Sequence, residues 1–224
     1  MGNIFSESGD LALLFDMDGV VVDSTAIHTE AWNQYLQMYG KRIPSLQHRM
    51  LGKHNDEIVR EFFDEVEMNQ AEVAQHGARK EQLYRSLIGP SLPAYMVPGI
   101  LAFLQAHQNL PMGLATNAEA ANVNFILDSA DLRRYFRCVV SGYDVQRPKP
   151  YPDVYLRAAS LLGVPPESCI VFEDSVVGVQ AAKAAGMRVV GVATTIRQLA
   201  GVDVMISDFR EPQLSSWLGH LTYS

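Results

Sequence analysis

The stretch Leu11-Ala-Leu-Leu-Phe-Asp16-Met-Asp18-Gly-Val-Val-Val-Asp23 decides the fold of this chain of 224 residues. Its first five residues are apolar without helical alternation, which is typical of a strand buried on both faces in a parallel sheet. Open α/β sheets bind ligands beyond the carboxyl ends of their strands, where Asp16 and Asp18 follow. Side chains two residues apart in extended chain share a face, so these carboxylates repel unless one holds a proton or a cation lies between them. The stretch predicts a parallel sheet with an acidic site at its edge.

The composition is typical of a globular protein and argues against several classes of partner. Hydrophobic residues make up 48% of the chain, charged residues 19%, and the formal net charge is -7. This charge disfavours a nucleic-acid surface, which needs clustered lysine and arginine. No apolar run is long enough to span a bilayer, and we interpret the short myristoylation pattern at residues 1–6 as a coincidence. We expect a cytoplasmic protein without nucleic-acid or membrane partners; its oligomeric state is not indicated, and a monomer is compatible with the sequence.

Helical patterns fill the seventy or so residues after Asp23. Ser24 is a candidate N-cap for a first helix that closes at Gly40, a second helix begins near Asn55, and a third covers residues 70–88. An all-helical insertion directly after the first strand would lie over the carboxyl end of that strand. We therefore predict a helical lid domain at residues 24–97, inserted into a core domain formed by residues 1–23 and 98–224.

Strand and helix patterns alternate from residue 98 onward. We expect strands at residues 112–116, 138–141, 169–172, 188–192 and 203–206, with helices after Gly99 and around 123–127, 154–162 and 176–185. Such alternation predicts βαβ units and an α/β fold, a Rossmann-like, doubly wound and mostly parallel sheet. Cys138 and Cys169 lie in or beside these strands, and we interpret them as reduced core thiols.

Two polar motifs near strand ends suit the binding of an anionic group. Thr116 and Asn117 follow the second strand, where a hydroxyl and backbone amides can donate to phosphoryl oxygens, although a helix cap is an equal interpretation. Lys149 stands between Pro148 and Pro150, which restrict its backbone. A lysine that delivers a fixed charge benefits from such restraint, because a pre-placed charge needs no reorganisation during reaction. The alternative is a solvated lysine at the start of the next helix.

A second pair of acids, Glu173 and Asp174, ends the strand at residues 169–172. One acid there could simply cap the following helix. Together with Asp16 and Asp18, however, the pair makes four acids at two strand ends, a set that suits a hard divalent cation. Mg²⁺ takes oxygen ligands, keeps several waters and is readily shared with a phosphate, so we predict Mg²⁺ as the cofactor.

These residues resemble the motifs of a known family. Asp16-x-Asp18-Gly, Thr116, Lys149 with its prolines and Glu173-Asp174 are similar to the four ordered motifs of the haloacid dehalogenase superfamily, in its phosphatase branch. The helical insertion resembles the C1 cap of the β-phosphoglucomutase and phosphoglycolate phosphatase group. The resemblance covers nearly the whole chain.

The resemblance implies a role for each motif. Asp16 would be the nucleophile that forms an aspartyl-phosphate, and Asp18 the general acid and then the general base. Thr116 and Lys149 would hold the phosphoryl group. The implied Mg²⁺ ligands are the Asp16 carboxylate, the Asp18 backbone carbonyl and Asp174, with Glu173 supporting them.

Substrate choice is expected to depend on Asn117 and on polar residues of the lid. The lid candidates are His28, Lys53, His54, Asn55 and Lys80. Lys80 shares a helical face with apolar residues, which indicates either a charge in a wet cleft or a lysine that snorkels out of the core. A surface histidine and a simple connecting loop are the alternatives for His28 and for residues 51–55.

The prediction is a Mg²⁺-dependent phosphatase that acts on a small phosphorylated metabolite, a sugar phosphate by preference. The rival is a β-phosphoglucomutase-type mutase, which resembles this chain at His28 and Lys80 but has arginine and lysine where Asn55 and Leu51 stand here. A mutase must grip a second phosphate, and a guanidinium suits that task; Lys53 or Arg60 could substitute. A phospho-accepting receiver or a binding protein is the alternative from another class, but receivers lack a helical lid.

Overall fold

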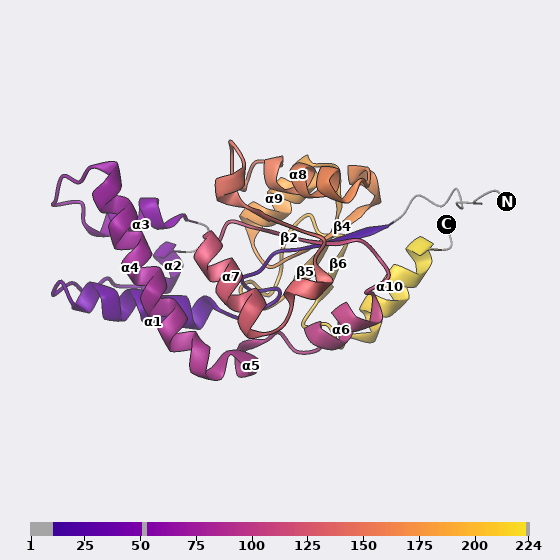
Figure 1. Cartoon of the computed structure of the whole chain (residues 1–224), viewed down its shortest axis with the longest axis horizontal. Coiled ribbons are helices and arrows are strands. Elements are labelled where there is room, and N and C mark those ends of the chain that lie inside the picture. The colour runs from indigo at the N-terminus through magenta and orange to yellow at the C-terminus, as the bar shows by residue number, and fades with distance from the viewer. Residues whose placement is uncertain (1–10, 51–52, 223–224) are drawn as a thin grey trace.

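A parallel sheet of six strands lies at the centre of the computed structural model, which describes residues 11–50 and 53–222 (Figure 1). The strands are β1 (Ala12–Phe15), β2 (Met112–Thr116), β3 (Cys138–Ser141), β4 (Cys169–Glu173), β5 (Arg188–Val192) and β6 (Val204–Ile206). Their order across the sheet is β3-β2-β1-β4-β5-β6, and every pairing is parallel. This arrangement confirms the predicted doubly wound, Rossmann-like fold.

The chain changes direction across the sheet between β1 and β4. It runs from β1 through β2 to β3 at one edge and then crosses back to β4 on the other side of β1. Such a switch point opens a crevice at the carboxyl ends of the two strands. Phe15 pairs with Phe172, and the Asp16 N–H donates to the Phe172 carbonyl at 3.0 Å. The acids that follow these two strands are therefore neighbours across the crevice.

Helices cover both faces of the sheet. Side chains alternate along β1, so that Leu13 and Phe15 join one buried apolar cluster while Ala12 and Leu14 join another. The first cluster is covered by α6 (Ile100–Ala106), α7 (Ala120–Ser129) and α10 (Pro212–Thr222), and the second by α8 (Asp153–Leu162) and α9 (Val176–Ala184). Burial of each such leucine or phenylalanine stabilises the fold by roughly 1.5–3 kcal/mol. The predictions above do not include α10, which Leu214 and Leu218 anchor.

A separate group of helices lies beyond one end of the sheet, on the left in Figure 1. These are α1 (Thr25–Gln37), α2 (Leu46–Met50), α3 (Asn55–Phe62), α4 (Gln70–Ile88) and α5 (Leu92–Tyr95). An apolar cluster of their own, around Trp32, Phe62 and Val73, holds α1 to α4 together. Short 3₁₀ turns lie at Gly89–Ser91, Arg133–Tyr135, Gly142–Asp144 and Pro166–Ser168.

The helix ends mostly follow the sequence signals. Asn69 precedes α4 and forms a capping box with Glu72. The Asn69 side chain accepts from the backbone N–H of Glu72, and the Glu72 carboxylate accepts from the backbone N–H of Asn69. The prediction that Ser24 caps α1 is wrong, since its side chain accepts no backbone N–H there. Its hydroxyl instead donates to Asp18 Oδ1 at 2.6 Å. A residue of the predicted lid therefore supports an acid of the site.

Two further predictions concern membrane-spanning helices and the two cysteines. Among the described residues, no helix combines the length and the apolar character needed to cross a lipid bilayer. Cys138 and Cys169 are both free thiols, as predicted.

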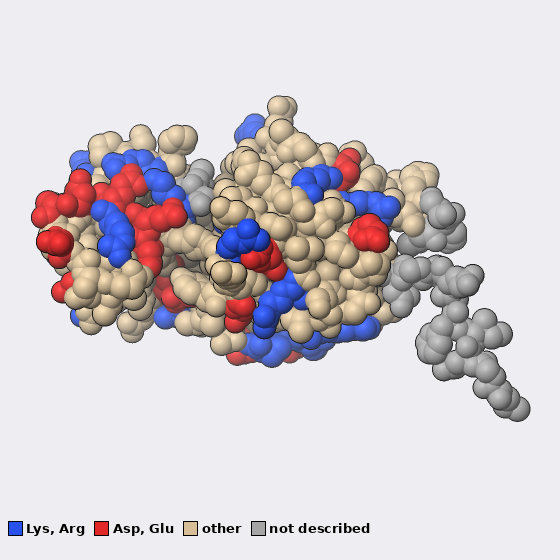
Figure 2. All heavy atoms as spheres, turned by 90° about the horizontal axis from the view of Figure 1, so that it is seen from above, with Lys and Arg blue, Asp and Glu red and all other residues tan. Residues whose placement is uncertain are grey.

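Charged side chains of both signs gather on the helical end of the molecule, whereas the core face seen in Figure 2 is mostly uncharged. The myristoylation pattern at residues 1–6 and Leu51 lie outside the described residues.

Candidate active site

A cavity of about 210 Å³ opens at the carboxyl edge of the sheet and reaches the helical group. Most of the residues singled out from the sequence line it, namely Asp16, Asp18, His28, Lys53, Asn55, Lys80, Thr116, Asn117, Lys149 and Asp174. Glu173 lies behind this wall and is fully buried. The fold thus gathers in one place side chains from four strand ends and from the helices that follow β1.

Lys149 is buried between two carboxylates. Its Nζ donates to Asp16 Oδ1 at 3.0 Å and to Glu173 Oε1 at 2.6 Å, and lies 4.7 Å from the centre of the Tyr155 ring. Burial alone lowers the pKa of Lys149, but the charges of Asp16 and Glu173 outweigh it and raise that pKa above its usual value. The side chain therefore stays charged, and the alternative of a solvated surface lysine is wrong.

Glu173 is held by five donors. Oε1 accepts from Lys149 Nζ and from the Tyr155 hydroxyl, each at 2.6 Å. Oε2 accepts from the Asp174 N–H at 3.1 Å, the Ser175 N–H at 3.2 Å and the Ser175 hydroxyl at 3.0 Å. Helix α9 approaches so closely that a Cβ at Gly178 would lie 1.7 Å from Glu173 Oε1. This carboxylate therefore fixes Lys149 more than it faces the cavity.

Tyr155 was missed by the sequence analysis. It lies on the buried face of α8, where a tyrosine at helical spacing is indistinguishable from a core residue. Its burial together with the nearby Glu173 charge raises its pKa well above the usual value, so the hydroxyl remains a hydrogen-bond donor.

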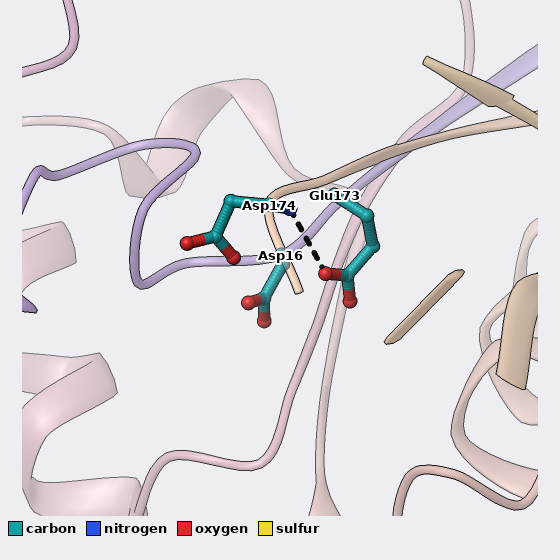
Figure 3. Close-up of side chains that lie close together, drawn as sticks. All are labelled: Asp16, Glu173 and Asp174. Carbon is teal, nitrogen blue, oxygen red and sulfur yellow. Dashed lines mark hydrogen bonds between the residues drawn. The ribbon is translucent and has the colours of Figure 1, made fainter. Parts of the chain in front are cut away.

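Three carboxylates converge beside Lys149. Oxygens of Asp16, Glu173 and Asp174 lie within 4.8 Å of one another, and Figure 3 shows their side chains turned toward a common point. Burial raises the pKa of Asp16 to about 7 in spite of Lys149, and it raises that of Asp174 well above its usual value. A buried cluster of carboxylate oxygens with too little positive charge nearby fits a hard divalent cation. The cation would offset both the cost of burying these charges and their mutual repulsion.

Gly19 lets the chain turn beside this cluster. It has φ of +77°, a conformation that side chains disfavour, and a Cβ there would lie 1.8 Å from Asp174 Oδ2. The Thr194 hydroxyl donates to the Gly19 carbonyl at 2.5 Å and holds the turn in place. The Asp-x-Asp-Gly motif thus needs its glycine for close approach as well as for the turn.

Asp18 lies on the side of Asp16 that faces the helical group. Besides the Ser24 hydroxyl, His28 Nε2 lies 3.5 Å from its Oδ1, and the His28 ring stacks on Tyr84 with the ring centres 3.8 Å apart. The Asp18 side chain is 32% exposed, in contrast to the buried Asp16. The Asp18 carboxylate is therefore more accessible to solvent or to a ligand than that of Asp16.

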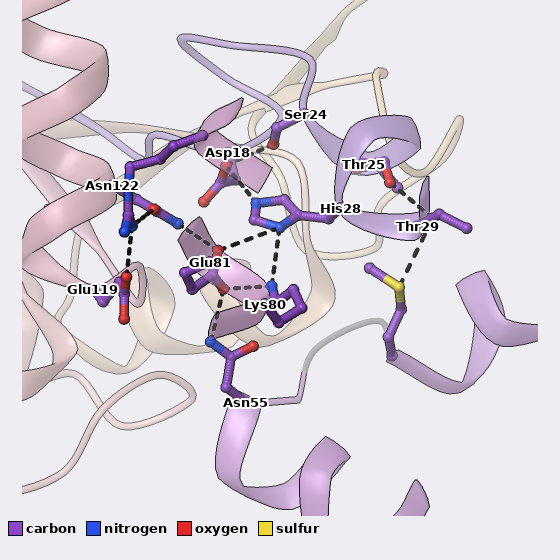
Figure 4. A network of polar contacts seen from close by, with 12 residues as sticks. Asp18, Ser24, Thr25, His28, Thr29, Asn55, Lys80, Glu81, Glu119 and Asn122 are labelled. Carbon is purple, nitrogen blue, oxygen red and sulfur yellow. Dashed lines mark hydrogen bonds and ion pairs between the residues drawn. The ribbon is translucent and has the colours of Figure 1, made fainter. Parts of the chain in front are cut away.

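A polar network joins the helical group to the core (Figure 4). At its centre Glu81 accepts from Lys80 Nζ, from Asn55 Nδ2 at 2.7 Å and from Asn122 Nδ2 at 2.7 Å. Asn122 belongs to α7 of the core. Burial tends to raise the pKa of Glu81, but Lys80 and the neighbouring His28 lower it to about 2.

Glu81 and Asn122 carry no sequence signal, because each lies in an ordinary helical pattern. Lys80 is only 2% exposed, so the interpretation that it snorkels to the surface is wrong. Its Nζ lies 3.3 Å from His28 Nδ1 at the cavity wall. Lys53 reaches the cavity too, but it forms an ion pair with Glu61.

Thr116 and Asn117 close the wall beside β2. The Thr116 hydroxyl is buried and accepts from the Ala118 N–H at 3.2 Å. The Asn117 side chain contacts the backbone of Lys149, which lies 32 residues along the chain. Both residues therefore belong to the same wall of the cavity as Lys149.

Comparison with known proteins agrees with this geometry. A sequence model of the haloacid dehalogenase-like hydrolases matches residues 11–186, which include all four motifs. The chain belongs to the haloacid dehalogenase-like hydrolases. This membership confirms the resemblance stated above and favours an enzyme over a signalling receiver.

Relatives within this hydrolase family include a sugar-phosphate phosphatase and a sugar-phosphate mutase. Fructose-1-phosphate phosphatase YqaB of Escherichia coli is 36% identical over 183 residues, 80% of this chain and 95% of that protein. β-Phosphoglucomutase of Bacillus subtilis is 30% identical over 204 residues, 87% of this chain and 88% of that protein. A solved hydrolase of family IA, variant 3, from Entamoeba histolytica superimposes with a TM-score of 0.84 at 25% identity, and covers 96% of this chain and 100% of that one.

Proposed function

We propose that this hydrolase is a Mg²⁺-dependent phosphatase that hydrolyses a small sugar phosphate through an aspartyl-phosphate on Asp16. One observation carries the proposal: the Lys149 ammonium is buried between Asp16 and Glu173 in the wall of a cavity shared with the helices at residues 24–97. A carboxylate can attack a phosphoryl group only when the negative charges are neutralised and the approach is fixed. Lys149 and the rigid strand ends supply both conditions.

The proposed chemistry has two steps. An Asp16 oxygen attacks phosphorus while the bond to the ester oxygen breaks, and Asp18 gives a proton to that leaving oxygen. A water molecule then attacks the phosphorus of the aspartyl-phosphate, and Asp18 takes its proton, so that Asp16 and inorganic phosphate are released. Lys149 and Thr116 hold the phosphoryl oxygens during both steps.

Mg²⁺ fits the same residues. We propose that the Asp16 carboxylate, the Asp18 carbonyl and Asp174 hold it, while Glu173, whose oxygens already accept five hydrogen bonds, orients Lys149 beside it. When bound, the ion would neutralise charge on the phosphoryl group. Asp18 remains free to donate and accept the proton, since its carboxylate contacts only the Ser24 hydroxyl and His28 among the described residues.

The helices at residues 24–97 are proposed to act as the lid that selects the substrate. His28, Lys53, Asn55 and Lys80 face the cavity from this side, and Asn117 faces it from the core. The Glu81 network that joins the two parts would let the lid seat in a defined position. Once closed over the bound ester, the lid would exclude bulk water.

Charge on the lid side supports hydrolysis over phosphoryl transfer between two sugar positions. Lys80 is paired with Glu81, and Lys53 with Glu61, which also accepts from Arg49. Asn55 stands where the mutase resemblance has an arginine, and its amide donates to Glu81. A second phosphate would find no unpaired cation among these residues, whereas hydroxyl groups of a neutral sugar would find both donors and acceptors.

The mutase is kept as the second candidate because of the Bacillus subtilis relative. Feeding β-glucose 1-phosphate with a trace of the bisphosphate separates the two activities. Release of inorganic phosphate is the expected result, and formation of glucose 6-phosphate would overturn it.

A panel of phosphorylated metabolites with Mg²⁺ tests the wider proposal. We expect turnover of p-nitrophenyl phosphate and of at least one sugar monophosphate, with activity abolished in Asp16→Asn. Asn55→Arg is the informative companion, because it restores a lid guanidinium and should favour bisphosphates. Stoichiometric, persistent labelling without turnover would contradict a phosphatase.

A further inference from the structure

The Asn117 side chain, which the sequence analysis assigned to substrate binding, is engaged with the protein itself. Its Oδ1 accepts from the Lys149 N–H at 3.2 Å, and its Nδ2 donates to the Lys149 carbonyl at 3.3 Å. The Asn117 amide thus forms hydrogen bonds to both the N–H and the carbonyl of Lys149. A Cβ at Gly142 would lie 2.9 Å from Asn117 Oδ1, so the turn after β3 closes over the amide from the side.

The second hydrogen of the same amide faces the lid. Asn117 Nδ2 lies 3.2 Å from Nε2 of His54, the residue that precedes α3. An amide nitrogen carries two hydrogens, and the Lys149 carbonyl and His54 account for both. Asn117 therefore has no donor left for a sugar hydroxyl.

Lys149 carries the charge that the site depends on. Lysine has a flexible four-carbon stem, so fixing its Nζ needs contacts at both ends. Asp16 and Glu173 hold the ammonium end, and Asn117 holds the backbone end. Misplacement of such a charge by about 1 Å is enough to lower a rate by roughly 100-fold.

We infer that Asn117 is a positioning residue for Lys149, and that His54 links the seating of the lid to it. The inference rests on the proposed function, in which Lys149 holds the phosphoryl group. A positioning role differs from a substrate contact in a measurable way. Every phosphate ester presents the same phosphoryl group to Lys149, so a displaced Lys149 affects all esters alike. A lost sugar contact would weaken only those esters that carry the sugar.

The test compares Asn117→Ala with wild type on p-nitrophenyl phosphate and on the best sugar phosphate of the panel. We expect kcat/KM to fall by roughly 10- to 100-fold, by the same factor for both esters. Asn109→Ala, at an exposed asparagine outside the cavity lining, is the matched control and should leave both values unchanged. A loss confined to the sugar ester would overturn the inference in favour of a direct contact.

Affinity for inorganic phosphate with Mg²⁺, measured by calorimetry, separates positioning from misfolding. A smaller folded fraction lowers the number of sites but leaves the affinity of each unchanged, whereas a displaced Lys149 lowers the affinity itself. We expect weaker phosphate binding in Asn117→Ala and intact binding in Asn109→Ala. Unchanged affinity in Asn117→Ala would refute the inference.

The lid link is tested by a double-mutant cycle with His54→Ala. His54→Ala alone should lower kcat/KM by a smaller factor, and the double variant should resemble Asn117→Ala, because the contact passes through that amide. If the fold-loss in kcat/KM of the double variant equals the product of the two single losses, the link is overturned. If wild type shows no turnover but Asn117→Ala still weakens phosphate binding, the proposed function fails while the positioning role of Asn117 stands.

Discussion

Replacement of Glu173 by glutamine removes one oxygen acceptor from a carboxylate that receives five hydrogen bonds. Whichever way the new amide turns, its NH₂ group faces at least two donors, either Lys149 and Tyr155 or the amides and hydroxyl of residues 174–175. Each buried donor left unpaired costs about 1–3 kcal/mol, and breaking a buried ion pair from one side costs about 3–5 kcal/mol. We therefore expect a loss of about 3–5 kcal/mol in the free energy of unfolding.

Thermal unfolding measures this loss directly. In a chain of this size 1 kcal/mol corresponds to roughly 2–4 °C, so Glu173→Gln should unfold about 6–20 °C below wild type. Glu167→Gln, the same change at an exposed glutamate just before β4, is the control and should shift the midpoint by less than about 2 °C. Activity should fall as well, since Lys149 loses one of its two anchors. A Glu173→Gln protein as stable as the Glu167→Gln control would refute this account of the buried charges.

Three further predictions concern the stability of the folded protein. Gly178→Ala should lower stability by about 1–3 kcal/mol, because its Cβ would meet the Glu173 carboxylate; an unchanged urea midpoint would contradict this. Mg²⁺ at about 100 times its dissociation constant should stabilise wild type by about 2.7 kcal/mol, and Asp174→Asn should lose most of this shift in melting temperature. Glu81, whose pKa is lowered from 4.5 to about 2, should contribute about 3 kcal/mol. That stability is present above about pH 4.5 and is lost as the pH falls toward 2. The difference in the free energy of unfolding between wild type and Glu81→Gln should therefore become smaller as the pH falls over this range.

Much of the site could be predicted because its residues stand at strand ends. Asp16 follows β1 and Glu173 ends β4, and in a parallel sheet the carboxyl ends of paired strands meet at one edge. Lys149 was marked by its flanking prolines, and the structure indeed buries its charge. The alternating pattern from residue 98 likewise predicted the strands and most of the helices.

The remaining residues were hidden because their partners lie far away in sequence. Tyr155 and Asn122 sit in helices whose apolar spacing is ordinary, and only the packing of α8 and α7 brings them to Glu173 and Glu81. Asn117 was identified, but nothing local to it indicates that its amide meets the backbone of Lys149. Sequence patterns locate chemistry at the ends of elements, whereas contacts between elements depend on tertiary geometry.

Trapping the phosphoryl group on Asp16 tests the central claim most directly. With p-nitrophenyl phosphate the leaving group needs no proton, so Asp18→Asn should form the aspartyl-phosphate but hydrolyse it slowly. After rapid quenching and borohydride reduction, which converts an acyl phosphate to an alcohol, mass spectrometry of the peptide spanning residues 11–23 should show homoserine in place of Asp16. An unmodified Asp16, in a protein that releases p-nitrophenol, would contradict the account.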